Sequence, residues 1–317
     1  AGILIMLFVS KIDYRIYITK LPIIKIRPVT LLYFLCIFLQ IAVIIFGEET
    51  KGAKRWLEIG GLGKFQPSEL SKIAVIIMAA YIVQLAPRKL DKITGFLRVA
   101  LIIAPLLGLV ISENFSTGLI IGIIMVAICF VASKKKAYFI ISGVVMGALA
   151  SLMIFFVDFR SDRVDAWINV ETHEKGYQIL QGLYAIASGG VFGKGLGESM
   201  QKLGFIPESH NDMIFSVICE ELGLFGAVSL ILLFILLLWR IFIIAINAPD
   251  LFGGLLATGV LAHIASQVLI NIAVVTSTIP STGIPLPFIS YGGSSLMVIL
   301  FEIGIVLSVS NQIKAER

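Results

Sequence analysis

The sequence is poor in charge, in cysteine and in histidine. Only 14% of its 317 residues are charged, whereas a soluble domain carries roughly 25%, so the chain lacks the polar surface of a water-soluble globule. Its three cysteines, Cys36, Cys129 and Cys219, lie far apart in apolar runs. They are therefore typical of small core residues and indicate neither a disulfide framework nor a metal cluster. The formal net charge of +5 is explained by loop position, and we expect no nucleic-acid partner.

Apolar residues make up 58% of the chain, and the mean hydropathy is +1.00. A span needs about 20 apolar residues, and this pattern predicts an all-α, polytopic integral membrane protein, a single membrane domain over residues 1–317. We expect a partial span at Ala1–Val9; since the chain opens without Met inside an apolar run, we interpret it as N-terminally truncated. The complete spans that we expect, about eight, are Val29–Gly47, Pro67–Leu85, Phe96–Ile111, Gly118–Val131, Ala137–Val157, Ile214–Ile246, Leu251–Val275 and Leu296–Ser310.

The loop charges predict the orientation of these spans. The segments assigned to the inside, together with Arg98 and Arg240 at the inner ends of their spans, hold 15 of the 25 Lys and Arg residues but only 4 of the 20 acids, as the positive-inside rule requires. The polar residues therefore gather on the outer side. The outer segments are Glu48–Gln66, Ser112–Thr117, the large extracytoplasmic loop Asp158–Asp212, and Thr276–Ser294.

The large loop ends in Gly204–Ser216, where Glu208, His210 and Asp212 fall at every second position before a long span. A carboxylate at the membrane surface, beside the positive end of a helix dipole, is costly to keep and suggests a function. The alternative is a helix cap supplied by Asn211 or Asp212.

Two further clusters have both a functional and a structural interpretation. Lys54, Arg55 and Trp56 could anchor a diphosphate through charge-assisted hydrogen bonds, or could be ordinary interfacial anchors. Glu69 and Lys72 lie three positions apart at the start of a span and can pair, in a structural or a catalytic role.

Other polar residues give weaker signals. Ser116 or Thr117 is expected to cap the span that follows Glu113. Buried acids within spans are expected to face the bundle interior, although their partners cannot be predicted; they are Glu220, Glu221 and Glu302. His173 and His263 are interpreted as structural. The run Ile279–Ser295 is too apolar for a free loop and too rich in proline for a helix, which predicts a re-entrant segment lining a cavity.

Five motifs stand in order along the chain: Lys51–Trp56, Phe65–Lys72, Gly193–Gly197, Pro207–Ser216 and Ile284–Ser295. Together they resemble the SEDS family, the FtsW/RodA/SpoVE proteins, and the last motif is closer to the FtsW/SpoVE branch. The resemblance covers essentially the whole chain. The sequence departs from the family at Asn211, where Thr is usual, and at Glu113–Thr117, where many members have Gln-Pro-Asp-x-Gly-Thr, so the role of Glu113 is left open.

The resemblance implies a ten-span polymerase in the bacterial cytoplasmic membrane, with its active site on the extracytoplasmic face. It would transfer glycan from lipid II to growing β-1,4 strands with inversion, with a class B penicillin-binding transpeptidase as partner and a divalent cation (Mg or Mn) of unassigned ligands. Membrane lipids would surround it. Asp212 is the expected general base. The expected substrate-binding residues are Lys54, Arg55, Trp56, Gln66, Ser68, Glu69, Lys72, Glu208, His210, Ser290, Gly292, Gly293 and Ser295.

Two other function classes fit the same sequence. Broken helices beside a polar cavity are typical of a transporter or lipid flippase, but the chain has no inverted repeat and its acids gather on one side. A non-catalytic scaffold for a cell-wall complex is the second alternative. Polymerisation of purified lipid II separates the enzyme from both.

Overall fold

The computed structural model describes the chain except residues 23, 24, 51, 52, 59–63, 142, 146, 148–157 and 314–317, and except the side chains of 48–50, 53, 158–162 and 175. Within the described residues, seven helices are long and apolar enough to cross a membrane. They are α2 (Pro28–Phe46), α3 (Pro67–Leu85), α4 (Ile93–Glu113), α5 (Phe115–Ala132), α9 (Ile214–Ile246), α10 (Leu251–Val275) and α11 (Gly293–Asn311).

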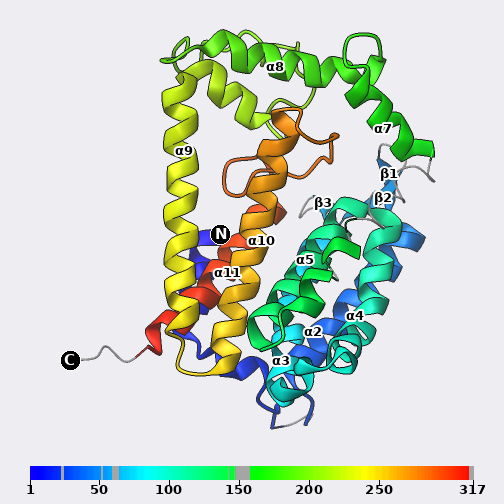
Figure 1. The fold of residues 1–317 in the computed structure, drawn as a ribbon, viewed down its shortest axis with the longest axis vertical. Helices are drawn as coiled ribbons and strands as arrows, with labels where there is room; N and C mark the ends of the chain where they lie inside the picture. The colour runs from blue at the N-terminus through cyan, green and yellow to red at the C-terminus, as the bar shows by residue number, and fades with distance from the viewer. Residues whose placement is uncertain are drawn as a thin grey trace. The chain divides into compact units, whose positions relative to one another are not determined.

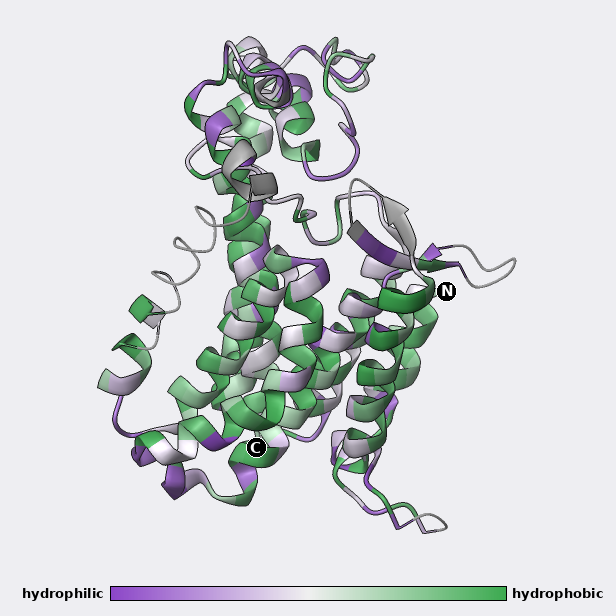
Figure 2. Cartoon of the chain, turned by 90° about the vertical axis from the view of Figure 1, so that its right-hand side faces the viewer, coloured by the Kyte–Doolittle hydropathy of each residue, from purple (hydrophilic) through white to green (hydrophobic). Residues whose placement is uncertain are grey.

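These helices confirm the all-α membrane class and lie where the apolar runs predicted them. Hydrophobic colour covers the long helices, and hydrophilic colour gathers in the connections between them (Figure 2). The short α1 (Gly2–Lys11) occupies the predicted partial span. Most of the predicted span Ala137–Val157 lies outside the described residues, so that span stays a prediction.

The chain divides into two compact units, each described here by itself. The first unit comprises Ala1–Val144, Arg240–His263 and Gly293–Arg317. The second comprises Val145–Trp239 and Ile264–Gly292. Both α9 and α10 therefore contribute residues to both units.

The core of the first unit is α3, which packs against α2, α4, α5 and α11 (Figure 1). Pro67 is its first residue, where a missing backbone N–H costs no hydrogen bond, and nearly all of its residues are buried. Close approach of α10 depends on Gly259, because a Cβ there would lie 2.7 Å from Ile76 of α3. On the other side of the unit, α1 packs against α11.

The segment Glu48–Gln66, predicted to be an outer loop, contains strands that the sequence did not predict. Three short strands, β1 (Glu48–Thr50), β2 (Ala53–Glu58) and β3 (Lys64–Phe65), form an antiparallel sheet in the order β1-β2-β3. Strands this short carry too few alternating residues for the pattern to be recognised among glycines and charges.

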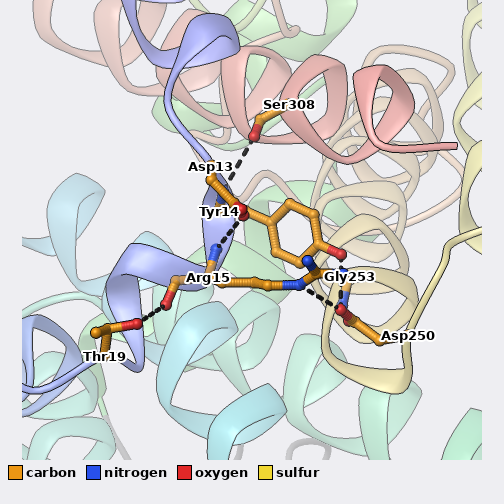
Figure 3. Close-up of polar contacts among 7 residues, drawn as sticks. All are labelled: Asp13, Tyr14, Arg15, Thr19, Asp250, Gly253 and Ser308. Carbon is orange, nitrogen blue, oxygen red and sulfur yellow. Dashed lines mark hydrogen bonds and ion pairs between the residues drawn. The ribbon is translucent and has the colours of Figure 1, made fainter.

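A polar cluster ties the segment after α1 to α10 and α11 (Figure 3). Asp250 accepts hydrogen bonds from the Tyr14 hydroxyl at 2.8 Å, Arg15 Nε at 2.9 Å and the Gly253 N–H at 2.8 Å. Burial alone would raise the pKa of Asp250, but these three donors outweigh it and hold that pKa below its usual value. Burial and the neighbouring carboxylate raise the pKa of Tyr14 to about 12. The Ser308 hydroxyl of α11 accepts a bond from the Tyr14 N–H.

The second unit contains α7 (Asp158–Ile168), η3 (Glu174–Gly176) and α8 (Tyr177–Gly189), all within the predicted large loop. Indole Nε1 of Trp167 in α7 donates a hydrogen bond of 2.7 Å to the carbonyl of Ser277. The segment between α10 and α11 is non-helical, as its prolines predicted, and this contact fixes it to α7.

Helix α9 of the second unit contains a break in its backbone. Gly223 has φ 65° and ψ −163°, which divides α9 into two helical segments. The loop after α8 fills the break: Lys194 and Gly195 donate N–H bonds to the carbonyls of Glu220 and Glu221. In return, the N–H groups of Leu224 and Phe225 donate to the carbonyls of Gly190 and Val191. Backbone groups that the break would leave unpaired are thus satisfied.

Candidate active site

Asp212 lies in the second unit, two residues before α9 begins at Ile214. Its side chain is half-buried, whereas Glu208 and His210 are exposed. Glu208 has a left-handed backbone (φ 53°), and its carbonyl accepts a bond from the Asn211 N–H. Neither Asn211 nor Asp212 directly precedes the helix, so a capping role for them stays a hypothesis. Of the three alternating polar residues, Asp212 is the one set into the protein.

A buried asparagine fixes the backbone at Asp212. Asn271 of α10 is 1% exposed, and its Nδ2 donates to the Asp212 carbonyl at 2.8 Å and to the Ile284 carbonyl at 2.9 Å. One side-chain amide therefore holds two segments that are far apart in the sequence. Deep burial limits the motion of this amide and of the backbone that it binds.

The same two segments are joined at two more points. Ser290 Oγ donates to the Asn211 carbonyl at 2.6 Å and accepts from the Leu286 N–H at 2.7 Å. The Tyr291 N–H donates to the His210 carbonyl at 2.8 Å, and the two rings meet edge to face with centroids 5.6 Å apart. The motifs around Asp212 and around Ser290 thus form one structure.

Gly283 lies in the part of the non-helical segment that runs beside the Asp212 carboxylate. It has φ 69°, a conformation that favours glycine, and a Cβ placed there would lie 4.0 Å from Oδ2 of Asp212. The non-helical segment therefore passes close to the Asp212 side chain, and Gly283 adds no side chain between them.

A buried ion pair lies in the first unit, as the spacing predicted. Lys72 Nζ and Glu69 Oε1 are 2.9 Å apart, and the side chains are 1% and 6% exposed. Ser295, in the first turn of α11, hydrogen-bonds to Glu69. Gln66 directly precedes α3, Ser68 is buried, Gly293 is the first residue of α11 and Gly292 precedes it. Of the predicted substrate-binding residues, this unit brings Glu69, Lys72 and Ser295 together.

The predicted cation cluster is divided by its strand. Successive side chains of β2 point to opposite faces, which separates Arg55 from Lys54 and Trp56. Arg55 Nε donates to the Glu113 carbonyl at 3.1 Å; burial lowers the pKa of Arg55, and the Glu113 carboxylate opposes this. Lys54 is exposed. The cations therefore lie on two faces of a strand rather than in an irregular loop, and their binding of a diphosphate stays a prediction.

Comparison with known proteins identifies the family. The model of the FtsW/RodA/SpoVE family of cell cycle proteins matches residues 1–315. The chain belongs to this family. It is 38% identical to stage V sporulation protein E of Bacillus subtilis, over 98% of this chain and 84% of that protein. It is 36% identical to the peptidoglycan glycosyltransferase MrdB of Escherichia coli, over 97% of this chain and 82% of that protein.

A solved structure supports the fold. One chain of a peptidoglycan synthase complex, described as coordinating polymerization and crosslinking, superposes with a TM-score of 0.81 at 25% identity. The match covers 99% of this chain and 88% of that one. The fold of this FtsW/RodA/SpoVE protein is therefore similar to that of a chain in a peptidoglycan synthase complex.

Several residues of this family member were not singled out from its sequence. Asn271 gave no signal, because a lone polar residue in an apolar run does not reveal which carbonyls it will bind.

Glu220 and Glu221 were expected to be buried, and the structure supplies their partners: Lys194 at 2.6 Å and Lys202 at 2.6 Å. The expected cap of α5 was wrong, because Asn114 fills that position and accepts the N–H of Thr117.

No group of three His, Cys, Asp or Glu side chains that could hold a metal ion occurs among the described residues. The donor set seen here does not fit a resident metal of that kind, and we derive no step through one. A hard cation such as Mg²⁺ commonly binds through substrate phosphates with one or two carboxylates.

Proposed function

We propose that this FtsW/RodA/SpoVE protein is a peptidoglycan glycosyltransferase that polymerises lipid II on the extracytoplasmic face of the cytoplasmic membrane. Its membership in the family and the glycosyltransferase name of its relative MrdB support the reaction class. The observation that supports the site is Asp212, a half-buried carboxylate on a backbone held by Asn271. We infer that Asp212 is the general base.

In this proposal the reaction is one direct displacement at an anomeric carbon. The Asp212 carboxylate removes the proton from the incoming sugar hydroxyl as its oxygen forms the new glycosidic bond. The bond to the diphosphate breaks at the same carbon, and the lipid diphosphate leaves with the electron pair. Attack opposite to the leaving group converts an α-linked donor into a β-1,4 product. The backbone anchors at Asn211 and Asp212 would keep the base in register with the hydroxyl.

The diphosphate needs cationic partners, and we assign Lys72 and Arg55 to this task. Lys72 is buried and already paired with Glu69, so its ammonium is held in position before substrate arrives. Arg55 is half-buried, and its guanidinium has further N–H donors beyond the one bound to Glu113. Lys72 and Asp212 belong to different units, and an effect of Lys72 on the charge of Asp212 stays a prediction.

A penicillin-binding transpeptidase is the partner that we propose. Crosslinking must follow polymerisation in cell-wall synthesis, and the related structure is part of a complex that coordinates the two. A transporter function is less favoured by the break in α9. Transporters present the free ends of broken helices to their cargo, whereas both ends here are bound by the loop after α8.

The test is lipid II polymerisation by purified Asp212→Asn protein. Asn keeps the shape of the side chain and removes the base, so folding should survive while the rate falls by about a hundred- to ten-thousand-fold. Glu171→Gln is the control, because it neutralises an exposed carboxylate in the same large loop to which no role is assigned. A near-normal rate for Asp212→Asn would refute the assignment.

A further inference from the structure

A second ionisable pair lies in the interior of the first unit, and the proposed function does not use it. Nδ1 of His263 on α10 and Oε2 of Glu302 on α11 are 2.7 Å apart, and both side chains are fully buried. Their helices come from distant parts of the chain. Ionisable groups inside a membrane domain are costly to keep, so two that meet call for an explanation.

This pair lies beside the Glu69–Lys72 ion pair. Glu69 interacts electrostatically with His263 and hydrogen-bonds to Ser295, which lies on α11 as Glu302 does. The packed helices α3, α10 and α11 thus present four ionisable side chains to one region of the interior. They are Glu69 and Lys72 on α3, His263 on α10 and Glu302 on α11.

The other elements that pack against these helices carry charges mainly at their ends. Helices α2 and α5, which pack against α3, have no charged residue. Helix α1, which packs against α11, carries only Lys11, at its end, and Asp250, directly before α10, is paired with Arg15. The strand β2, the helix α4 and the 3-10 helix η2 (Pro87–Asp91) also pack against α3, and their charged residues are Lys54, Arg55, Glu58, Arg98, Glu113, Arg88, Lys89 and Asp91. Of these, Arg55 and Glu113 interact with each other. We therefore count the charge of the four buried groups as one set.

Their charges balance only if the group holds one additional proton. Two carboxylates and one ammonium leave a net charge of −1 when the imidazole is neutral. An uncompensated charge is expensive in an apolar interior. Oε1 of Glu302 is buried and accepts no hydrogen bond from the described residues, so a full charge on this carboxylate would be compensated through Oε2 and His263 alone. One proton on this pair makes the sum zero.

We propose that His263 and Glu302 bind one proton between them, so that the four buried groups together carry no net charge. Lys72 then stays in position for an anionic substrate. This inference rests on the proposed function, in which Lys72 faces the lipid diphosphate. His263 and Glu302 are positioning residues, because they act through Lys72. Loss of the shared proton leaves a second carboxylate to compete for Lys72 and to repel the diphosphate. The affinity for lipid II falls, while the chemistry at Asp212 is untouched.

The test compares three variants in lipid II polymerisation, with KM and kcat determined separately. His263→Gln leaves the Glu302 carboxylate without its counter-charge, and KM for lipid II should rise at least about fivefold, the lower end of coupling between interacting groups, while kcat stays near wild type. Glu302→Gln leaves a neutral set and should keep KM near wild type. The double variant His263→Gln/Glu302→Gln removes both charges and should restore KM.

The KM measurements distinguish this role from a purely structural one. If the pair only fills space, His263→Gln lowers stability and leaves KM unchanged, or the double variant does not restore KM; either result overturns the proposal. A measurement without substrate covers variants that fail to fold: ¹⁵N spectra of histidine-labelled wild type should show His263 sharing a proton with Glu302. An imidazole that stays neutral beside an ionised Glu302 overturns it as well. Failure of the proposed function instead appears as full activity in Asp212→Asn.

Discussion

The glycine loop that fills the break in α9 offers a sharp test of how the second unit is held together. Gly193 has φ 77°, and a Cβ there would lie 2.1 Å from the carbonyl oxygen of Glu221 and 2.6 Å from the backbone N of Leu222. Both neighbours are backbone atoms and cannot rotate away. Gly193→Ala must therefore move the loop off the helix break.

The expected cost has two parts. A non-glycine residue in the left-handed region costs about 1–2 kcal/mol. Moving the loop also weakens the two N–H bonds from Lys194 and Gly195 to α9, each worth about 1 kcal/mol net. We expect Gly193→Ala to lower the free energy of unfolding by roughly 3–4 kcal/mol.

Substitutions at two other glycines distinguish the conformational cost from the cost of moving the loop. Gly197 also has a positive φ (87°), but a Cβ there would meet nothing within 4 Å, so Gly197→Ala should cost only the conformational part, about 1–2 kcal/mol. Gly108 lies inside α4 with open space around it, and Gly108→Ala should be neutral or stabilising by up to about 1 kcal/mol.

Thermal and denaturant unfolding of the purified proteins in one detergent measures the three variants. Equal losses for Gly193→Ala and Gly197→Ala would refute the reasoning, because backbone conformation alone would then account for the effect and the close approach to α9 would contribute nothing.

Three other predictions follow from the structure. Because the pKa of Asp250 lies below its usual value, its stabilisation is complete above about pH 4 and is lost as the pH falls through its folded pKa; the melting-temperature difference between wild type and Asp250→Asn should shrink on acidification, and a constant difference would contradict this. Arg55→Ala should raise KM for lipid II more than Lys54→Ala does, because Arg55 is half-buried and Lys54 is exposed; equal effects would remove Arg55 from the diphosphate site. Cysteines at Lys175 and Lys135 report the topology in intact cells: an impermeant reagent should label the first and spare the second, and the reverse pattern would invert the proposed orientation.

The spans were predictable because the bilayer imposes a length on them. The run Pro67–Leu85 was bounded correctly at both ends, since Pro67 fits the first turn and the apolar run has the length that a span needs. The Glu69–Lys72 pair was predictable for a similar reason: three positions on one helix fix which side chains can meet. Predictions of this kind depend only on local geometry.

Contacts between segments were not predictable in the same way. The sheet of Glu48–Gln66 depends on a bulged register between strands of two to six residues. The break in α9 depends on Gly223 meeting a loop that lies about thirty residues earlier, where the loop supplies the donors that the helix lacks. A glycine in an apolar helix gives no sign of such a partner.

The polar residues inside the spans show why this difference matters for function. Hydropathy shows that Glu302 and His263 are costly where they are, but it cannot show that they meet, because their contact depends on how α10 and α11 are rotated against each other. A buried charge must find a partner, and in a membrane domain that partner usually lies on another helix. Sequence therefore identifies which residues need an explanation, and helix packing supplies the partner. In this protein the packing joins His263 and Glu302 and places them beside Glu69, which converts separate costly residues into one group whose net charge can be counted and tested.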